Sequence, residues 1–360
     1  MDPMAMPQMM TRAAVEATQA WADRIAGFGT FLENPPQVSV GETPADVIYS
    51  ENKLRLLRYR PERGAIHPTP VLIVYALINR PYVLDLQHDR SVVRRLLEAG
   101  LDVYLIDWGS PSQIDQWLTL DDYVNRYLEN CVDAVRVKSG SSDVTVLGYC
   151  MGGAMSTMYA ALHPEKVRNL VLMAAPLVFD GGDGLLRLWS RPEYFDADKI
   201  VEAFGNAPGG FLDAGFQFLK PVENMYAKYA NFAKYAGNEE FVANFLRMEQ
   251  WSRDTIPVAG ETYRQFIKEL YQSNKLARNE LALDGKPVRL DGLMMPLLLL
   301  TGKFDHLVPN ESTSAFLEFV PSTDKEWIDV PTGHIGLSVS SRAHRDVWPK
   351  VCEWIVARSG

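Results

Sequence analysis

The sequence predicts an α/β domain built on a mostly parallel sheet, with helices on both faces and an inserted helical cap. Short, almost continuous apolar runs alternate with helical patterns, as is typical of parallel strands buried on both faces. This alternation breaks down between Pro176 and Leu293, where helical stretches and glycine-rich breaks replace it. A chain of 360 residues is long enough to form a large core and to carry such an insertion.

The predicted elements follow directly from the apolar runs. An edge strand is expected at 54–59, and further strands at 70–74, 103–106, 144–147, 170–174, 297–300 and 326–330. Helices are expected at 13–33, 91–99, 120–137, 153–163, 312–319 and 344–358, and in the cap near 222–236, 239–251 and 260–274. The chain thus divides into a first part of the core (1–176, with the N-terminal helix), a cap (177–293) and a second part of the core (294–360).

The cap segment is enriched in aromatic residues. A small helical domain needs aromatic side chains for its own core, which accounts for most of them. The alternative is a lid over an apolar product path, and the sequence leaves both interpretations open.

The net charge and the cysteine content argue against several classes of protein function. The net charge of -9 and the isoelectric point near 5.3 argue against general nucleic-acid binding. They also require a local cationic patch for any anionic substrate. The odd number of cysteines, without a CxxC pair, indicates neither a disulfide framework nor a zinc site and fits a reducing compartment. With no recognisable signal peptide or membrane-spanning run, we expect a cytoplasmic protein without a metal or a separate cofactor.

The motif richest in chemistry surrounds Cys150. An apolar strand at 144–147, the turn Gly148-Tyr149-Cys150-Met151-Gly152-Gly153 and a helical pattern form a nucleophile elbow with cysteine at its apex. Glycine at 148 and 152 suits a tight, strained turn. The apex lies at a helix N-terminus, where the dipole favours a thiolate. A buried structural cysteine is the competing interpretation.

Two further residues complete a triad in the order nucleophile, acid, histidine, which is that of the α/β-hydrolase fold. Asp305 follows the predicted strand 297–300, and His334 follows the predicted strand 326–330. Since the carboxyl ends of parallel strands meet at one edge of a sheet, we expect Cys150, Asp305 and His334 to lie together. His67, His88, His163 and His344 are interpreted as surface or capping residues, whereas His306 could line the site.

An oxyanion hole needs two backbone N–H groups. Met151, which follows the nucleophile, is expected to supply one, and either Ile78 or Asn79, in the loop after strand 70–74, the other. Arg80 in the same loop could contact a phosphate or adenine of a large substrate. A structural ion pair explains Arg80 equally well.

In combination these motifs resemble the poly(3-hydroxyalkanoate) synthases over nearly the whole chain. The resemblance is carried by residues 74–82, 102–109, 148–153, 259–266, 305–309 and 333–335. The short length resembles the two-subunit synthases of classes III and IV, whose catalytic subunit needs a small partner, PhaE or PhaR respectively. The Gly-Tyr-Cys-Met-Gly-Gly string favours class IV but leaves class III open.

The resemblance implies a mechanism. His334 deprotonates Cys150, which attacks the thioester of an (R)-3-hydroxyacyl-CoA, such as 3-hydroxybutyryl-CoA, and releases coenzyme A. A 3-hydroxyl group then attacks the held acyl group and forms an ester bond, while Asp305 orients His334 or helps to activate the hydroxyl. The resemblance further implies a position at the surface of polymer granules, and it leaves homodimer formation open.

Two other functions compete with this interpretation. One is a cysteine hydrolase or thioesterase resembling dienelactone hydrolase, although those enzymes are shorter and lack a large cap. The other is a non-catalytic, granule-associated scaffold. The complete set of Cys150, Asp305 and His334 argues against the scaffold.

Overall fold

The computed structural model describes residues 38–61, 64–180 and 184–360, so the helix expected at 13–33 lies outside the described residues. Contacts divide the chain into two compact units. Among the described residues, the smaller unit comprises 38–39 and Lys220–Gln250, and the larger lies within Val40–Leu219 and Trp251–Gly360. The boundaries expected for the cap, at 177 and 293, remain a prediction.

The larger unit is built on an eight-stranded sheet with the order β1-β2-β6-β3-β7-β8-β11-β12. Its two antiparallel pairings join β1 (Ala45–Glu51) to β2 (Leu54–Tyr59) and β2 to β6 (Val103–Asp107). All other pairings in this sheet are parallel, which confirms the predicted, mostly parallel architecture. The remaining strands are β3 (Val71–Val74), β7 (Val144–Tyr149), β8 (Val167–Met173), β11 (Leu297–Gly302) and β12 (Lys325–Val330).

The prediction that 54–59 forms the edge strand is wrong. The edge strand is β1, and β2 lies between β1 and β6. Strand β1 was missed because no side chain in it is buried and a register shift between Val47 and Tyr49 interrupts its alternation. Asn52, at a positive φ of 53°, makes the tight turn that joins the two strands.

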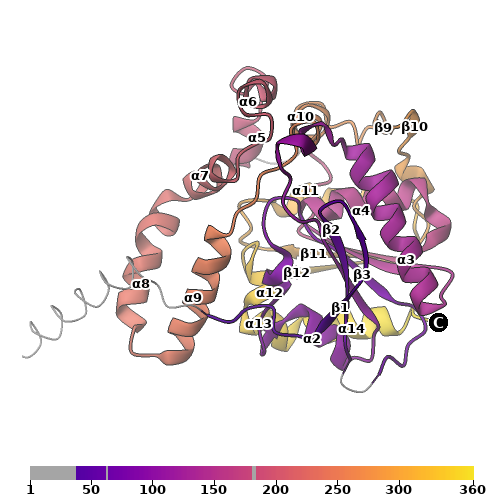
Figure 1. Ribbon diagram of the computed structural model, residues 1–360, viewed down its shortest axis with the longest axis horizontal. Helices are drawn as coiled ribbons and strands as arrows, with labels where there is room; N and C mark the ends of the chain where they lie inside the picture. Colours follow the sequence, from indigo (N-terminus) through magenta and orange to yellow (C-terminus); the bar gives the residue numbers. More distant parts are fainter. Residues whose placement is uncertain (1–37, 62–63, 181–183) are drawn as a thin grey trace, which may run out of the picture. The chain divides into compact units, whose positions relative to one another are not determined.

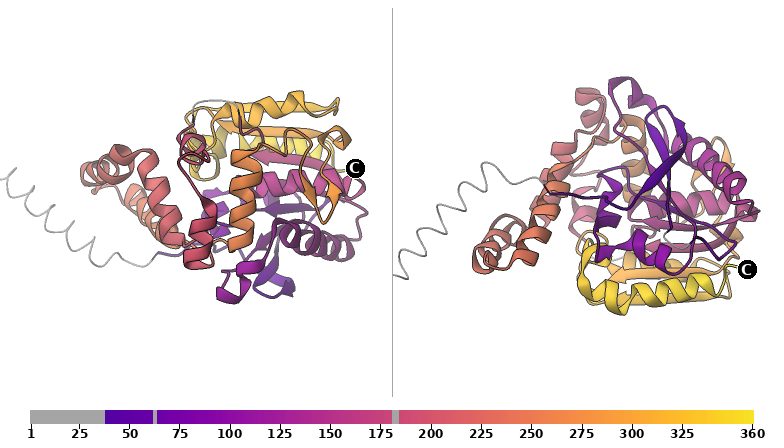
Figure 2. Two further views of the ribbon diagram at one scale, coloured as in Figure 1. Left: turned by 90° about the horizontal axis from the view of Figure 1, so that it is seen from above. Right: turned by 60° about the horizontal axis from the view of Figure 1, so that its bottom comes forward.

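Helices cover both faces of the sheet (Figure 1). On one face lie α3 (Glu129–Ser139) and α4 (Met151–Leu162), and on the other α2 (Val92–Glu98) and α14 (Trp348–Val356). The C-terminal helices form a layer along their side of the sheet in both views of Figure 2. The helix predicted at 120–137 has two parts, because a π-helical segment at Asp122–Leu128 precedes α3.

The segment between β8 and β11 is mainly helical, as predicted. Within the larger unit it contains α5 (Leu185–Trp189), α6 (Ala197–Phe204), α7 (Gly209–Leu219), α10 (Gly260–Gln265) and the π-helical segment η6 (Phe266–Gln272). A short hairpin of β9 (Ala282–Leu283) and β10 (Lys286–Pro287), which was not predicted, follows them.

The smaller unit contains the π-helical segment η5 (Val222–Ala227), α8 (Lys228–Tyr235) and most of α9 (Glu239–Arg253). An ion pair of 2.7 Å joins Lys228 of α8 to Glu249 of α9. The rings of Phe232 and Phe245 pack against each other, with their centroids 4.5 Å apart. The aromatic residues here therefore serve, at least in part, the unit's own core.

After β11 the chain forms α11 (Asn310–Ser314), α12 (Gly336–Val339) and α13 (Ser341–Asp346) before α14. His344 was expected at the surface, but it is buried in α13 with Nε2 2.6 Å from the carbonyl oxygen of Ser338. Its partner lies in the preceding helix, so local sequence could not show its burial. None of the helices in the described ranges is long and apolar enough to cross a membrane.

Candidate active site

Cys150 occupies a strained turn between β7 and α4. Its φ of 56° and ψ of -127° lie in a region that non-glycine residues rarely adopt. The backbone N–H of Cys150 donates to the carbonyl oxygen of Met173, at the end of β8, over 2.9 Å. The turn places the thiol at the amino end of α4, where unpaired amides and the helix dipole favour a negative charge.

The turn depends on the missing side chains of neighbouring glycines. A Cβ on Gly152 would lie 2.1 Å from the carbonyl oxygen of Val74, and one on Gly148 would lie 2.6 Å from the Cα of Gly153. Gly153 itself packs closely against Ala175. Since the obstructing atoms include backbone, these clashes cannot be relieved by rotating a side chain. The elbow therefore requires the glycines that the sequence places there.

His334 and Asp305 meet at the same edge of the sheet. His334 Nδ1 lies 2.7 Å from Asp305 Oδ2, and both side chains are almost fully buried. The other carboxylate oxygen accepts the N–H groups of Leu307 and Val308, each over 2.9 Å. The ring of Tyr149 stacks on the imidazole with centroids 5.3 Å apart. This holds the imidazole in one orientation and leaves Nε2 available.

Electrostatic interactions link Cys150 to the pair of His334 and Asp305. Burial acts to lower the pKa of His334, but the negative charges of Asp305 and Cys150, with hydrogen bonds to both, raise it to about 10. The Asp305 carboxylate and the Cys150 sulfur therefore both favour the protonated form of His334. By contrast, burial raises the pKa of Cys352 to about 12 and that of Cys131 still further. Cys150 is half-buried, and it alone of the three cysteines has a base beside it.

Comparisons with known proteins agree with this geometry. Residues 69–340 match the model of the α/β-hydrolase fold, and residues 37–96 match that of the N-terminus of poly-beta-hydroxybutyrate polymerase (PhaC). The poly(3-hydroxyalkanoate) polymerase subunit PhaC of Haloferax mediterranei is 55% identical over 359 residues, which cover 100% of this chain and 73% of the relative. The subunit PhaC of Allochromatium vinosum is 44% identical over 346 residues, covering 95% and 97%.

The chain belongs to the poly(3-hydroxyalkanoate) polymerase family. Solved structures agree on the fold alone. A soluble variant of monoglyceride lipase from Saccharomyces cerevisiae aligns with a TM-score of 0.59 at 15% identity, covering 91% of this chain and 99% of that one. The α/β-hydrolase fold predicted from the elbow and the order of the triad residues is therefore confirmed, and the chain is a polymerase, an acyltransferase.

Backbone amides suited to an oxyanion hole lie near the polymerase's elbow. Met151 is the first residue of α4, so its N–H has no partner within the helix. In the described part of the chain, no acceptor is hydrogen-bonded to the amides of Ile78 and Asn79 either. The carbonyl of Ile78 accepts the N–H of Ile256 over 3.2 Å. The structure does not choose between Ile78 and Asn79.

The two candidate substrate contacts, Arg80 and His306, lie outside the triad. Arg80 Nε forms an ion pair of 3.4 Å with Asp254, as the structural alternative predicted, and its side chain is about one-third exposed. His306 is half-buried on the loop that carries Asp305. The Asp305 carboxylate, however, bonds to His334 and to backbone amides. Substrate contacts by Arg80 and His306 remain predictions.

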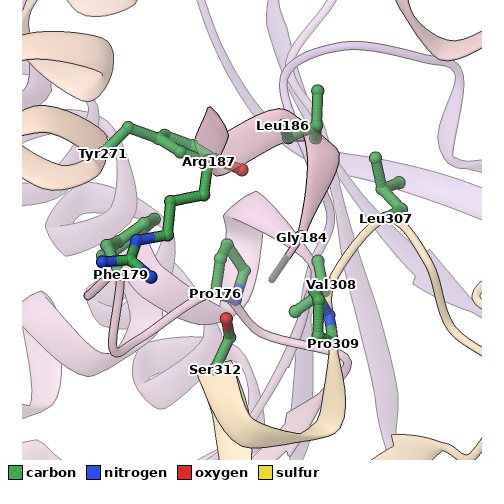
Figure 3. A pocket seen from close by; sticks show the side chains of 10 residues that line it. All are labelled: Pro176, Phe179, Gly184, Leu186, Arg187, Tyr271, Leu307, Val308, Pro309 and Ser312. Carbon is green, nitrogen blue, oxygen red and sulfur yellow. The ribbon is translucent and has the colours of Figure 1, made fainter. Parts of the chain in front are cut away.

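A pocket lies beside the loop that carries Asp305 (Figure 3). Its non-atom space, solvent at the mouth included, is about 330 Å³, and among the described residues that line it Arg187 alone is formally charged. Phe179, Arg187 and Tyr271 form one side, whereas Leu307, Val308 and Pro309 face them. The lining is completed by Pro176, Gly184, Leu186 and Ser312.

Tyr271 is a residue of this site that the sequence did not single out. Burial is the main cause that raises its pKa, and the charges of Cys150 and Asp305 add to the increase. The phenol therefore stays neutral within electrostatic reach of the triad. The sequence offered only an aromatic residue among many in a helical segment, so no local signal could have identified Tyr271.

The raised pKa of His334 predicts a distinctive titration. In the wild type the imidazole should remain protonated until about pH 10, whereas in Asp305→Asn its pKa should fall, because burial then opposes protonation with one charge fewer. The associated stabilisation is complete below the ordinary value of 6.5 and is lost as the pH rises through about 10. NMR titration, with His334→Gln to assign the signal, measures this. A wild-type value near 6.5 would contradict the charged site.

The close approach at the elbow predicts a glycine-specific effect. Gly152→Ala should lower the free energy of unfolding by about 1–3 kcal/mol, because the new Cβ meets the Val74 carbonyl, and should abolish activity. Gly215→Ala in α7 is the control, since its Cβ meets nothing within 4 Å and helical alanine stabilises by about 0.5–1 kcal/mol. Chemical unfolding of both variants compares them. Equal stabilities would show that the elbow tolerates a side chain.

Proposed function

We propose that this polymerase joins (R)-3-hydroxyacyl units, taken from coenzyme A thioesters such as 3-hydroxybutyryl-CoA, through a covalent thioester on Cys150. The observation that carries this proposal is the buried pair of His334 and Asp305, whose imidazole is paired electrostatically with the elbow cysteine. The relatives are poly(3-hydroxyalkanoate) polymerases, and a hydroxyacyl thioester is the substrate class that such a nucleophile can use.

In the first half-reaction His334 holds the proton that it has taken from the Cys150 thiol, and the thiolate attacks the thioester carbonyl. The amides of Met151 and of Ile78 or Asn79 stabilise the oxyanion that forms. The carbon–sulfur bond to coenzyme A then breaks, and the leaving thiolate takes the proton from His334. Since one thioester replaces another, the acyl group remains activated for the next step.

In the second half-reaction the 3-hydroxyl of another unit attacks the Cys150 thioester. His334 takes the hydroxyl proton as the ester bond forms, and the cysteine leaves as a thiolate ready for the next cycle. Asp305 is engaged through one oxygen by His334 and through the other by two backbone amides. This arrangement supports an orienting role for Asp305 rather than direct activation of the hydroxyl.

The pocket in Figure 3 supports an assignment for the acyl part of the substrate. Most of its lining residues are apolar, although polar and apolar atoms share its exposed surface about equally, and Tyr271 brings a neutral phenol within electrostatic reach of Cys150. Arg187 supplies a positive charge, which an anionic donor needs in a protein of net charge -9.

We further propose that the chain works with a small partner subunit, of the PhaE or PhaR type, at the surface of polymer granules in the cytoplasm. The names of the relatives support an assembly, because each is called a subunit. A water-insoluble polyester that remains attached to Cys150 during growth would keep the enzyme at the granule surface.

The nucleophile assignment predicts a clear difference between the cysteines. Cys150→Ala should abolish release of coenzyme A from 3-hydroxybutyryl-CoA and formation of insoluble polymer, whereas Cys131→Ala and Cys352→Ala, buried away from the triad, should retain most of both. Assays of free coenzyme A and of sedimented polymer measure the two products. Release without polymer in the wild type would indicate a thioesterase, and activity in Cys150→Ala would refute the assignment.

The partner proposal predicts the kinetics of the isolated chain. The purified chain alone should show a lag or a low initial rate, and adding the cognate small subunit should raise that rate to a plateau, as binding by mass action requires. Initial rates of coenzyme A release against partner concentration test this. Full polymerisation without a lag by the chain alone would remove the case for an obligatory partner.

A further inference from the structure

The loop that carries the candidate oxyanion amides is held by a segment distant in sequence. We call Ala76–Pro81 the oxyanion loop and Trp251–Ile256 the clamp segment. The N–H of Ile256 donates to the carbonyl of Ile78 over 3.2 Å, and Asn79 forms an isolated antiparallel bridge with Thr255. Trp251 Nε1 donates to the carbonyl of Arg80 over 2.9 Å. Backbone contacts and a buried indole thus bind the loop along its second half.

Asp254 adds side-chain contacts at the end of this loop. One carboxylate oxygen accepts from Arg80 Nε at 3.4 Å, and the other accepts from the hydroxyl of Tyr82 at 3.3 Å. These two partners flank Pro81, so the carboxylate spans the point where the loop enters the next turn. The Asp254 side chain is 43% exposed, so the core does not depend on its packing.

These contacts determine how the loop presents its amides. Because a trans peptide directs its C=O and N–H to opposite sides, the Ile78 carbonyl, held by Ile256, turns the N–H of Asn79 away from the clamp segment. A backbone donor stabilises an oxyanion only when it is aimed before the charge develops. The clamp segment therefore restricts the part of the site for which orientation matters most.

We propose that Asp254 is a positioning residue for acyl transfer. Acting with Trp251 through Arg80, it holds the oxyanion loop so that its amides face the oxygen of the attacked thioester. This inference rests on the proposed function, since it requires acylation of Cys150. It assigns Arg80 to the support of the loop, and it makes the clamp segment a determinant of the acylation rate.

The test separates two reactions of the same cysteine. Acylation of Cys150 by 3-hydroxybutyryl-CoA needs the oxyanion amides, whereas alkylation by iodoacetamide needs only the nucleophilic sulfur and His334. In Asp254→Ala the single-turnover rate of coenzyme A release at saturating substrate should fall about tenfold or more, as expected when reacting groups lose their alignment. The alkylation rate, the concentration for half-saturation and the thermal midpoint should stay unchanged.

Two further variants and a control sharpen the comparison. Asp254→Asn keeps an oxygen that accepts from Tyr82 and should recover part of the acylation rate. Trp251→Phe removes the N–H to Arg80 but keeps an aromatic ring, and it should reproduce the selective loss. Asp46 on β1 carries a similarly exposed carboxylate, which is paired with Arg60. The control Asp46→Ala should leave the acylation rate and the alkylation rate unchanged.

Each outcome decides the proposal. A selective loss of acylation in Asp254→Ala and Trp251→Phe supports it. An unchanged acylation rate in Asp254→Ala overturns it, and so does a parallel fall in acylation and alkylation, because that would show a general disturbance of the site. Failure of the proposed function is distinguishable, since the wild type itself would then release no coenzyme A from the thioester or would release it without forming insoluble polymer.

Discussion

The backbone conformation of Cys150 is the constraint on which the site depends. A non-glycine residue at a φ of 56° is unfavourable, and it persists only because the surroundings impose it. Here the hydrogen bond to Met173 and the contact of Gly152 with the Val74 carbonyl impose it. Because α4 begins directly after this residue, the same turn places the sulfur at the helix N-terminus and beside His334. The order of the strands, the placement of the glycines and the position of the nucleophile therefore all depend on the same turn.

The features that the sequence predicted well are those with a local signal. The elbow and Asp305 each follow a buried apolar strand and His334 follows the edge strand β12, so their meeting follows from the rule that parallel strands end at one edge. Strand β1, the buried His344, Tyr271 and the contacts of Asp254 have no such signal. Each depends on residues distant in sequence or, for β1, on pairing by an exposed strand with irregular alternation.

The charge balance at the triad explains why cysteine, aspartate and histidine work here in a buried setting. A buried imidazolium alone would be unfavourable, and so would a buried carboxylate alone. Together they compensate one another, which is why the pKa of His334 rises to about 10 despite burial. Acylation of Cys150 removes the interaction by which its sulfur raises the pKa of His334. Acylation therefore favours loss of the His334 proton, which is the proton that the departing coenzyme A thiolate needs.

The clamp segment begins in the last turn of helix α9. Helix α9 begins at Glu239 in the smaller compact unit and ends at Arg253, within the clamp segment of the larger unit. Its last turn supplies Trp251, whose indole N–H reaches the Arg80 carbonyl in the oxyanion loop. The residues that support the oxyanion loop therefore come from the end of one helix and from the turn that follows it.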